Sequence, residues 1–307
     1  MGSSLKNENI FKKISVAMCT CNGEKYLNEQ LHSILNQSSK PGELIICDDC
    51  STDNTIQIIE SYSAKYPKNI SVHLNEKNLG VIKNFEKAIL LTTGDFIFLS
   101  DQDDIWYPDK IKKMISLLNE NSNILLVFSN GDLIDETGES IGSTLWGKWN
   151  FTEEIRENWK NNKLAFHDLF KIHNKVTGAT IAFKKKLKKH LIPIKVPLDY
   201  WHDQWFALHA AALNGLYFTE ESLIKYRVHT KQQVGLPESN QLINNESTFN
   251  GSVSIEEFHC FIEKKYSRLF DKNSSYPVFL LHIYRFFIRT LVRIKRLANK
   301  FILRIKH

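Results

Sequence analysis

Apolar and polar positions alternate along the first 130 residues in a way that predicts strands and helices in turn. Apolar residues at steps of three and four, such as Leu27, Leu31 and Ile34, are typical of the buried face of a helix. Short apolar runs, which are typical of buried strands, cover residues 14–20, 44–47, 70–74, 96–99 and 124–128. Helical spacing recurs after each of the first four runs. Strands that alternate with helices form a largely parallel sheet, so the pattern predicts an α/β fold.

The second half of the chain is less regular. Residues 132–144 are rich in turn-forming side chains and predict a hairpin, and residues 146–163 predict a loop or a short helix. Residues 176–183 read as a strand. An apolar helix is expected from Asp203, and Gly215 can end it because glycine commonly follows the last turn of a helix.

The positive charge of the chain is concentrated at its end. Residues 276–307 hold eight Lys and Arg and no Asp or Glu, and because the whole chain has a net charge of +6, the first 275 residues carry −2. The body is therefore not expected to bind nucleic acid. The basic residues of this tail recur at helical spacing, and no stretch of ~18 residues lacks a charge. We expect an amphipathic helix on an anionic membrane surface, with a helix docked on the body as the alternative.

The cysteines indicate a reducing environment. There are five, an odd number, and no N-terminal secretion signal is apparent, which favours the cytoplasm. Together with the basic tail, this predicts a cytoplasmic protein that is peripherally associated with the inner face of the cell membrane. The spacing of Cys19, Cys21, Cys47 and Cys50 could suggest zinc. However, Cys19 and Cys47 lie within apolar runs, which favours free cysteines that pack as small hydrophobic side chains.

Acidic and polar residues follow four of the predicted strands. In parallel sheets ligands bind beyond the carboxyl ends of the strands, which here are followed by residues 20–23, 48–49, 75–80 and 101–104. Three aspartates within residues 101–104 repel one another, so either the loop is solvated or a cation neutralises it. No glycine-rich phosphate loop occurs, and oxygen ligands suit Mg²⁺ or Mn²⁺. The pattern predicts a site for such a metal and the phosphates that it carries.

Four motifs in this order resemble one family. "VAMCTCNG", "ICDDCSTDNT", "NEKNLGVIKNFEKA" and "LSDQDDIW" are similar to the nucleotide-binding half of the inverting glycosyltransferases of family 2, which have the GT-A fold. The wording of "DQDDIWYPDKI", "YWHDQW" and "YRVHTKQQVG" is most similar to bacterial rhamnosyltransferases and related enzymes of surface polysaccharide synthesis. The resemblance covers roughly residues 14–235. It implies transfer of a sugar from dTDP-rhamnose or a UDP-hexose to a hydroxyl of a growing, lipid-linked glycan, with Mn²⁺ or Mg²⁺ as cofactor.

The resemblance also implies roles for individual residues. Asp103 would bind the metal directly, Asp101 would bind the ribose or the metal through water, and His229 would help to hold the metal. Arg227 and His229 would bind the diphosphate. The nucleotide would lie near Thr20, Asn22, Asp48, Asp49, Lys83, Asp101 and Gln102. The alternatives are an Asx turn at Asp49, a solvated loop around Asp101 and Asp103, and a polar loop after an edge strand at Arg227 and His229.

Asp203 is the candidate general base. Tyr200, Trp201, His202 and Trp205 surround it in the sequence, and aromatic surroundings desolvate a carboxylate and raise its pKa, as a base requires. The resemblance implies that it deprotonates the acceptor hydroxyl, although the family usually has a Glu-Asp pair where this chain has His202-Asp203. The alternative is that Asp203 only caps the helix.

Four regions follow from these assignments. Residues 1–130 would form the nucleotide-sugar-binding half, 131–235 the acceptor-binding and catalytic half, 236–275 a linker and a helix, and 276–307 the membrane-associating tail. Two other functions stay open. One is a metal-dependent nucleotidyltransferase or phosphatase, which would not need Asp203. The other is a non-catalytic, membrane-bound scaffold that binds a nucleotide.

Overall fold

The computed structural model describes residues 14–171, 174–197, 200–230, 232 and 253–270. The chain divides into two compact units, residues 1–252 and 253–307, which are considered separately. The predicted boundary at residue 130 lies inside the first unit and within a strand, so the two expected halves share one sheet.

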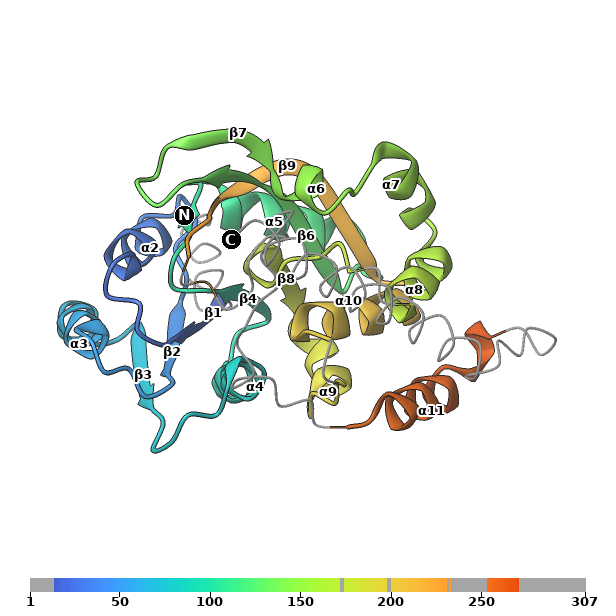
Figure 1. Ribbon diagram of the computed structural model, residues 1–307, viewed down its shortest axis with the longest axis horizontal. Coiled ribbons are helices and arrows are strands. Elements are labelled where there is room, and N and C mark those ends of the chain that lie inside the picture. The colour runs from blue at the N-terminus through green and yellow to red at the C-terminus, as the bar shows by residue number, and fades with distance from the viewer. Residues whose placement is uncertain (1–13, 172–173, 198–199, 231, 233–252, 271–307) are drawn as a thin grey trace, which may run out of the picture. The chain divides into compact units, whose positions relative to one another are not determined.

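Residues 14–120 form the alternating elements that the hydrophobic pattern predicts (Figure 1). The helices are amphipathic, and each turns its apolar stripe inward; α2, for example, buries Leu27, Leu31 and Ile34. The strands are β1 (Ile14–Thr20), β2 (Glu43–Asp48), β3 (Ile70–Leu74) and β4 (Phe96–Ser100). The helices are α2 (Leu27–Leu35), α3 (Thr55–Lys65), α4 (Val81–Leu91) and α5 (Lys110–Glu120).

One sheet runs through the first unit, in the order β3-β2-β1-β4-β8-β6-β9-β5, with β7 paired to β6. Strands β3, β2, β1 and β4 are parallel, and β1 is buried along almost its whole length because helices cover both faces of such a sheet. The chain runs from β1 to β2 and β3 on one side of β1, and then returns through α4 to β4 on the other side. This switch point is where open α/β sheets bind ligands.

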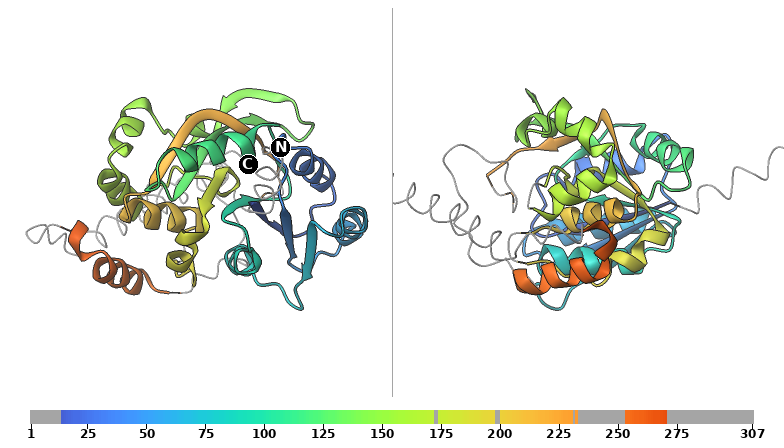
Figure 2. Two further views of the ribbon diagram at one scale, coloured as in Figure 1. Left: turned by 180° about the vertical axis from the view of Figure 1, so that it is seen from behind. Right: turned by 90° about the vertical axis from the view of Figure 1, so that its right-hand side faces the viewer.

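The second half completes the sheet with mixed directions. Strand β8 is antiparallel to β4 and β6, whereas β9 is parallel to β6 and antiparallel to β5. On the face seen from behind, α5 packs against β6 and β8 (Figure 2). The strands are β5 (Ile105–Trp106), β6 (Leu126–Ile134), β7 (Ser140–Thr144), β8 (Ile181–Lys184) and β9 (Leu216–Arg227).

Short helices fill the connections of this half. The helices are α6 (Leu145–Lys148), α7 (Glu153–Trp159), α8 (Asn162–Phe170), α9 (Lys188–Leu191) and α10 (His202–Ala212), with 3₁₀ turns η1 (Gly178–Thr180) and η2 (Lys185–Leu187).

Three predictions for this half meet different outcomes. The hairpin over 132–144 is confirmed as β6 and β7. The strand over 176–183 is wrong in its first part, because residues 178–180 form a 3₁₀ turn before β8 begins. Residues 146–163, expected as a loop or one short helix, contain most of α6, all of α7 and the start of α8.

The apolar residues of this region pack as an aromatic cluster whose members come from distant elements: Phe128, Trp146, Phe151, Trp159 and Phe218.

The second unit contains α11 (Ile255–Lys265) and the 3₁₀ turn η3 (Ser267–Leu269), which lie where a helix was expected within residues 236–275. Ser254 and Glu257 form a capping box at its start. The expected loop over 236–248 and the basic tail over 276–307 lie outside the described residues. Within the described ranges, no helix is both long enough and apolar enough to cross a membrane.

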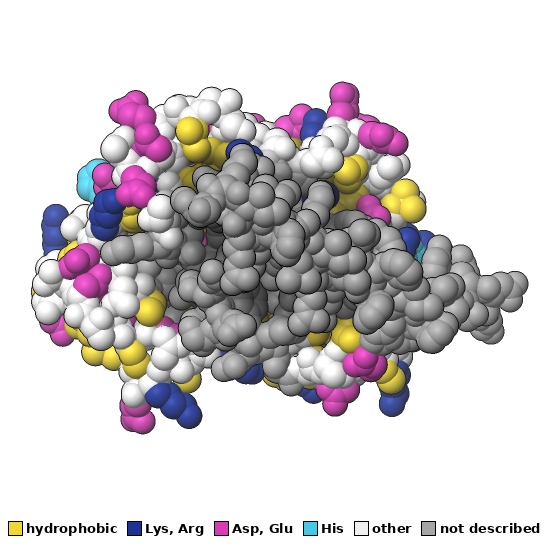
Figure 3. Space-filling view, viewed as in Figure 1, with side chains coloured by type: hydrophobic (Ala, Val, Ile, Leu, Met, Phe, Trp, Pro, Cys, Tyr) yellow, Lys and Arg dark blue, Asp and Glu magenta, His cyan; other side chains and the backbone are white. Residues whose placement is uncertain are grey.

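The charged side chains that are visible on one face of the molecule are mixed in sign. In Figure 3, Asp and Glu side chains and Lys and Arg side chains are interspersed around the rim, over elements of both halves of the sheet. Neither sign forms a continuous field among the coloured atoms of that view.

Candidate active site

The carboxyl ends of β1, β2 and β4 open onto a cavity of about 1240 Å³. Residues from the loops after these strands line one part of it, and residues of the 174–178 loop, α10 and the end of β9 line the rest. The cavity exceeds the ~300–1,000 Å³ of a pocket for one small molecule, so it has room for a second substrate.

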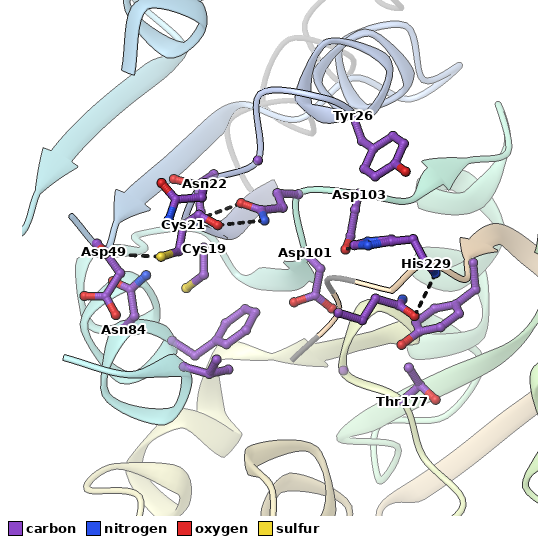
Figure 4. Close-up of a pocket in the computed structure, with 18 of the residues that line it drawn as sticks. Cys19, Cys21, Asn22, Tyr26, Asp49, Asn84, Asp101, Asp103, Thr177 and His229 are labelled. Atoms are coloured by element: carbon purple, nitrogen blue, oxygen red, sulfur yellow. Dashed lines mark hydrogen bonds and ion pairs between the residues drawn. The ribbon is translucent and has the colours of Figure 1, made fainter. Parts of the chain in front are cut away.

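Asp101 and Asp103 both line this cavity from the loop after β4, and Figure 4 places them between Asp49 and His229. The Asp103 carboxylate lies 2.9 Å from Nε2 of His229, whose ring lies 5.0 Å from that of Tyr26. Burial, with the nearby charges of Asp103 and Asp203, raises the pKa of Asp101 to about 7. The two carboxylates expected to bind a metal thus lie in one cavity with His229, which is more than 120 residues away in the sequence.

Gln102, between these aspartates, joins the β4 loop to the β1 loop. Its side-chain amide accepts from the backbone N–H of Cys21 at 2.7 Å and donates to the Cys21 carbonyl at 3.0 Å (Figure 4). A Cβ atom at Gly23 would lie 2.4 Å from Oε1 of Gln102, so residue 23 needs to be glycine for this contact. Gln102 lines the cavity, but its amide is engaged with the backbone.

Asp48 and Asp49, both expected near the nucleotide, lie in different surroundings. The Asx turn belongs to Asp48, which accepts from Ser51 N at 2.8 Å and from Thr20 Oγ1 at 2.7 Å, and Asp48 does not line the cavity. Asp49 does line it. Its carboxylate accepts from the backbone N–H groups of Leu79 and Gly80 at 2.7 and 2.8 Å. It is oriented by the loop before α4 and faces the same part of the cavity as Asn84 (Figure 4).

Thr20 and Asn22 lie at the carboxyl end of β1 and line the cavity. Asn22 has a φ of 52°, which asparagine tolerates better than most side chains. Its Oδ1 accepts from Thr52 N at 2.8 Å, and its own N–H donates to Ser51 Oγ at 2.8 Å. These bonds attach the loop after β1 to the loop after β2.

The surroundings of Cys21 and Cys47 at this end of the sheet disfavour the thiolate. Burial is the main cause that raises the pKa of both Cys21 and Cys47 to about 11, and nearby carboxylates add to it. Cys21 donates a hydrogen bond to the carbonyl of Asp49 at 3.4 Å. A zinc ligand is a thiolate, so these surroundings favour the interpretation that the cysteines are free.

Arg227 supports the acidic loop from outside the cavity. It is 1% exposed, and its Nε donates to the carbonyl of Asp103 at 3.0 Å while its Nη1 donates to the carbonyls of Asp135 and Glu136. It also forms an ion pair with Glu29. The guanidinium therefore positions the backbone that carries Asp103, and its expected contact with a diphosphate is not favoured by this geometry.

Lys83 also lies outside the lining of the cavity. It is on the first turn of α4, and its amine pairs with Glu86 at 3.2 Å on an exposed surface. Its expected position near a nucleotide stays a prediction.

Lys110 is a buried cation that the sequence analysis did not single out. It is completely buried on α5, donates to the carbonyl of Ala179, and lies 4.0 Å from the centre of the Trp106 ring. Burial lowers its pKa to about 7, and the charges of Asp104 and Asp101 oppose that shift. Asp104 is itself buried, and burial raises the pKa of its carboxyl. Lys110 thus lies behind the acidic loop and connects α5 to the η1 turn.

Asp203 lies in the first turn of α10 and lines the cavity. Trp201, not Asp203, is the N-cap residue, so the cap alternative is not the geometry observed. The carboxylate accepts from Gln204 N at 2.6 Å, from Asn174 Nδ2 at 3.0 Å and from Gly178 N at 3.2 Å. Burial outweighs these bonds and raises the pKa of Asp203 to about 7.

The aromatic neighbours of Asp203 separate into two groups. Tyr200 and Trp205 are each 1% exposed and belong to the core, whereas Trp201 and His202 line the cavity. His202 stacks on Phe85 with 4.3 Å between the ring centres, and neither ring nitrogen has a hydrogen-bond partner within the described part of the chain. Burial lowers its pKa to about 3, so His202 is neutral.

The donor set fits Mg²⁺ or Mn²⁺. Asp101 and Asp103 face the same cavity, and their mutual repulsion is what a divalent cation would relieve. Among the described residues, no three His, Cys, Asp or Glu side chains converge to form a complete protein cage. Mg²⁺ commonly binds through one or two carboxylates and takes its other ligands from phosphate and water, so a complete cage is not required.

Comparison with known proteins identifies the class. Residues 15–191 match the family model for glycosyl transferase family 2, and the chain belongs to that family. It is 32% identical over 229 residues to the dTDP-rhamnosyl transferase RfbG of Shigella flexneri, which is 71% of this chain and 73% of RfbG. It is 36% identical over 126 residues to the putative glycosyltransferase EpsE of Bacillus subtilis. That match spans 41% of this chain and less than half of EpsE, 45% of its length.

Solved structures show the same fold. TarS of S. aureus in complex with UDP-GlcNAc is 19% identical, with a TM-score of 0.54, over 82% of this chain and 71% of that one. The mannosyltransferase PcManGT from Pyrobaculum calidifontis, in complex with GDP-Man and Mn²⁺, is 17% identical, with a TM-score of 0.51, over 71% and 58%. At these identities the likeness concerns the fold alone, and the expected GT-A fold is confirmed.

Proposed function

We propose that this chain is an inverting, metal-dependent glycosyltransferase that moves a sugar from a nucleotide-diphospho-sugar to a hydroxyl of a growing, lipid-linked surface glycan. The observation that carries the proposal is a single cavity with two acidic centres. Asp101 and Asp103 lie at the end of β4, and Asp203 lies on α10 with a pKa near neutrality. The first centre suits a metal and a diphosphate, and the second suits a base.

The names of the relatives support the choice of substrates. RfbG is a dTDP-rhamnosyl transferase, and TuaG of Bacillus subtilis, 36% identical over 109 residues, is a putative teichuronic acid biosynthesis glycosyltransferase. TarS binds UDP-GlcNAc. The proposed donor is therefore dTDP-rhamnose or a UDP-hexose, and the proposed acceptor is a bacterial surface glycan.

The donor would occupy the part of the cavity at the carboxyl ends of β1, β2 and β4. Thr20, Asn22 and Asp49 would lie near the nucleotide, and Asp101, Asp103 and His229 near the diphosphate. Mn²⁺ or Mg²⁺ held by Asp101 and Asp103 would supply positive charge against the charge that develops on the departing diphosphate. Arg227 and Gln102 contribute by holding the backbone of this loop in place.

Asp203 performs the proton transfer. A carboxylate oxygen of Asp203 accepts the proton of the acceptor hydroxyl, and the acceptor oxygen forms a bond to the anomeric carbon. The bond from that carbon to the diphosphate oxygen breaks, and its electron pair leaves with the nucleoside diphosphate. Attack from the face opposite the leaving group inverts the anomeric configuration. Asn174 and Gly178 orient the carboxylate during this step.

The test begins with Asp103→Ala and the purified chain. Calorimetry with UDP or dTDP should show binding that depends on Mn²⁺ in the wild type and is lost in the variant, because Asp103 is assigned to the metal. Glu60→Ala, an exposed acidic position outside the cavity, should bind like the wild type.

A screen of dTDP- and UDP-sugars for Mn²⁺-dependent hydrolysis and transfer identifies the donor. Full metal-dependent binding by Asp103→Ala would contradict the metal assignment. Products that contain transferred phosphate or nucleotide, and no transferred sugar, would favour the nucleotidyltransferase or phosphatase alternative. Binding without turnover of any donor would favour the scaffold.

A further inference from the structure

Two tryptophans of the cavity differ from all the others in the chain. The sequence has six tryptophans, and all lie in described residues. Four are buried in the core: Trp106, Trp146, Trp159 and Trp205. The remaining two, Trp149 and Trp201, are half-buried, and both line the cavity that contains Asp203. Large aromatic faces that remain accessible in a binding cavity are typical of ligand contacts.

The position of Trp149 is fixed by the loop that also holds Asp203. Its indole N–H donates to Thr177 Oγ1 at 3.2 Å, and its carbonyl accepts from Lys175 Nζ at 2.6 Å. Asn174 and Gly178, at the two ends of the same short loop, donate to the two carboxylate oxygens of Asp203. The Trp149 indole and the Asp203 carboxylate are therefore both bonded to the loop over residues 174–178.

Trp201 approaches Asp203 from the other direction along the chain. It is the N-cap residue of α10, with φ −107° and ψ 161°, and Asp203 follows two residues later in the first turn. Trp201 thus belongs to the helix that carries the carboxylate, and Trp149 is bonded to the loop that orients it.

Trp149 lies apart from the proposed nucleotide end. In Figure 4, Asp49 and Asn84 lie on one side of Asp101, and Thr177, which bonds to Trp149, lies on the other side with His229. A donor whose base lies near Asp49 and whose diphosphate lies near Asp103 would leave the Thr177 side for the second substrate.

We propose that Trp149 and Trp201 form an acceptor subsite that packs against a pyranose ring of the acceptor glycan. This rests on the proposed function, because it assigns the acceptor side of the same cavity. A pyranose ring has faces of C–H groups that can cover an indole, and its rim of hydroxyls can reach Asp203 and the polar side chains of Asn174 and Thr177. A lipid chain has no hydroxyl groups to bond to these polar side chains, so the sugar part of the acceptor fits better than its lipid part.

The test measures transfer to methyl and octyl glycosides of hexoses and 6-deoxyhexoses, with the donor found by the screen above. In Trp149→Leu and Trp201→Leu, the acceptor KM for a methyl glycoside should rise roughly tenfold, which is the effect expected when an aromatic contact is lost. Hydrolysis of the donor without acceptor, and binding of the nucleoside diphosphate, should stay within about twofold of wild type, since neither tryptophan is assigned to the donor. Trp149→Phe should recover much of the acceptor affinity.

Controls keep each outcome decisive. Tyr217→Leu removes an aromatic side chain that is 41% exposed on β9 and outside the cavity, and it should leave the acceptor KM unchanged. An unchanged methyl-glycoside KM in both tryptophan variants would overturn the subsite while the proposed function stands. A loss confined to octyl glycosides would assign the surface to lipid and also overturn it. If the wild type transfers no sugar at all, the proposed function fails first and the subsite with it.

Discussion

Asp203 accepts three hydrogen bonds that favour its ionised form, yet its pKa is raised to about 7. Burial disfavours the charge by more than these donors favour it. The result is a carboxylate that is a stronger base than an exposed aspartate and is still ionised in a useful fraction near neutral pH. The hydrogen bonds from Gln204, Asn174 and Gly178 oppose the effect of burial and keep the pKa from rising further.

Asp203→Asn should nearly abolish sugar transfer. The change keeps the size of the side chain and removes the group that accepts the proton, a step whose positioned base contributes about 10²–10⁴-fold. Metal-dependent binding of the nucleoside diphosphate, measured by calorimetry, should stay near wild type, because Asp203 is assigned to the acceptor. Asp109→Asn, at an exposed position outside the cavity, is the matched control. Near-normal transfer would mean that the base lies elsewhere.

The same carboxylate predicts how activity and stability vary with pH. Transfer by the wild type should fall as the pH drops through about 7, because Asp203 then becomes protonated and cannot act as a base. The effect of this carboxyl group on the stability of the fold runs in the opposite direction with pH. The folded state binds this proton more tightly than the unfolded chain, so between about pH 4 and 7 the group favours folding more as the pH falls. Rate profiles and melting temperatures between pH 5 and 9, for wild type and Asp203→Asn, check both statements.

At the scale of elements, the site is assembled where loops after neighbouring strands bond to one another. Gln102 supplies a donor and an acceptor to the backbone of Cys21, as an adjacent strand would, and so extends the β1–β4 pairing beyond the ends of the strands. The absence of a Cβ at Gly23 allows this approach. The loop with Asp101 and Asp103 is thus fixed against the loop with Thr20.

A double-mutant cycle between these two loops tests that coupling. Gly23→Ala should displace the Gln102 side chain and weaken nucleoside diphosphate binding by roughly tenfold, because the acidic loop loses its connection to β1. In a Gln102→Ala background, Gly23→Ala should cost little more, since the clashing group is gone. Isothermal titration of the four proteins gives the coupling. Additive losses would show that the two loops are positioned independently.

At the scale of the whole molecule, catalysis and membrane association are expected to separate along the chain. The body that contains the cavity has a formal charge of −2, and the eight basic residues of the tail account for the positive total. Anionic surfaces attract such clusters with about 1 kcal/mol per basic residue. The tail lies outside the described residues, so this role is argued from composition alone.

Removal of residues 276–307 should therefore abolish binding to anionic liposomes and leave transfer to a short, soluble glycoside largely intact. Co-sedimentation with liposomes that contain phosphatidylglycerol measures the first effect, and a rate assay measures the second. Replacing the eight basic residues with glutamine, at full length, separates charge from helix length. Unchanged liposome binding by the truncated chain would favour the alternative of a helix docked on the body.

Much of the fold and part of the site follow from local pattern. Periods of two and of three to four separate strands from helices without reference to distant contacts, and this is why β1 to β4 and α2 to α5 are placed correctly. The loop with Asp101 and Asp103 also stands out, as does Asp203, because carboxylates directly after a strand or within an aromatic segment are chemically conspicuous. The two-residue strand β5 and the 3₁₀ turn before β8 were missed or misplaced, since their conformations depend on partners far along the chain.

Tertiary structure decided which polar groups face the cavity. The sequence presents Asp48 and Asp49 as equals, and only the position of the loop before α4 turns Asp49 toward the cavity while Asp48 bonds within its own turn. Arg227 is a conspicuous basic residue, but its partners come from three distant segments and hold it behind the loop. Lys110, Asn174 and Trp149 lack a local signal, because their roles arise from contacts with residues 28 to 69 positions away. Local pattern determines elements and candidate chemistry, whereas the direction of a side chain depends on which distant backbone group it meets.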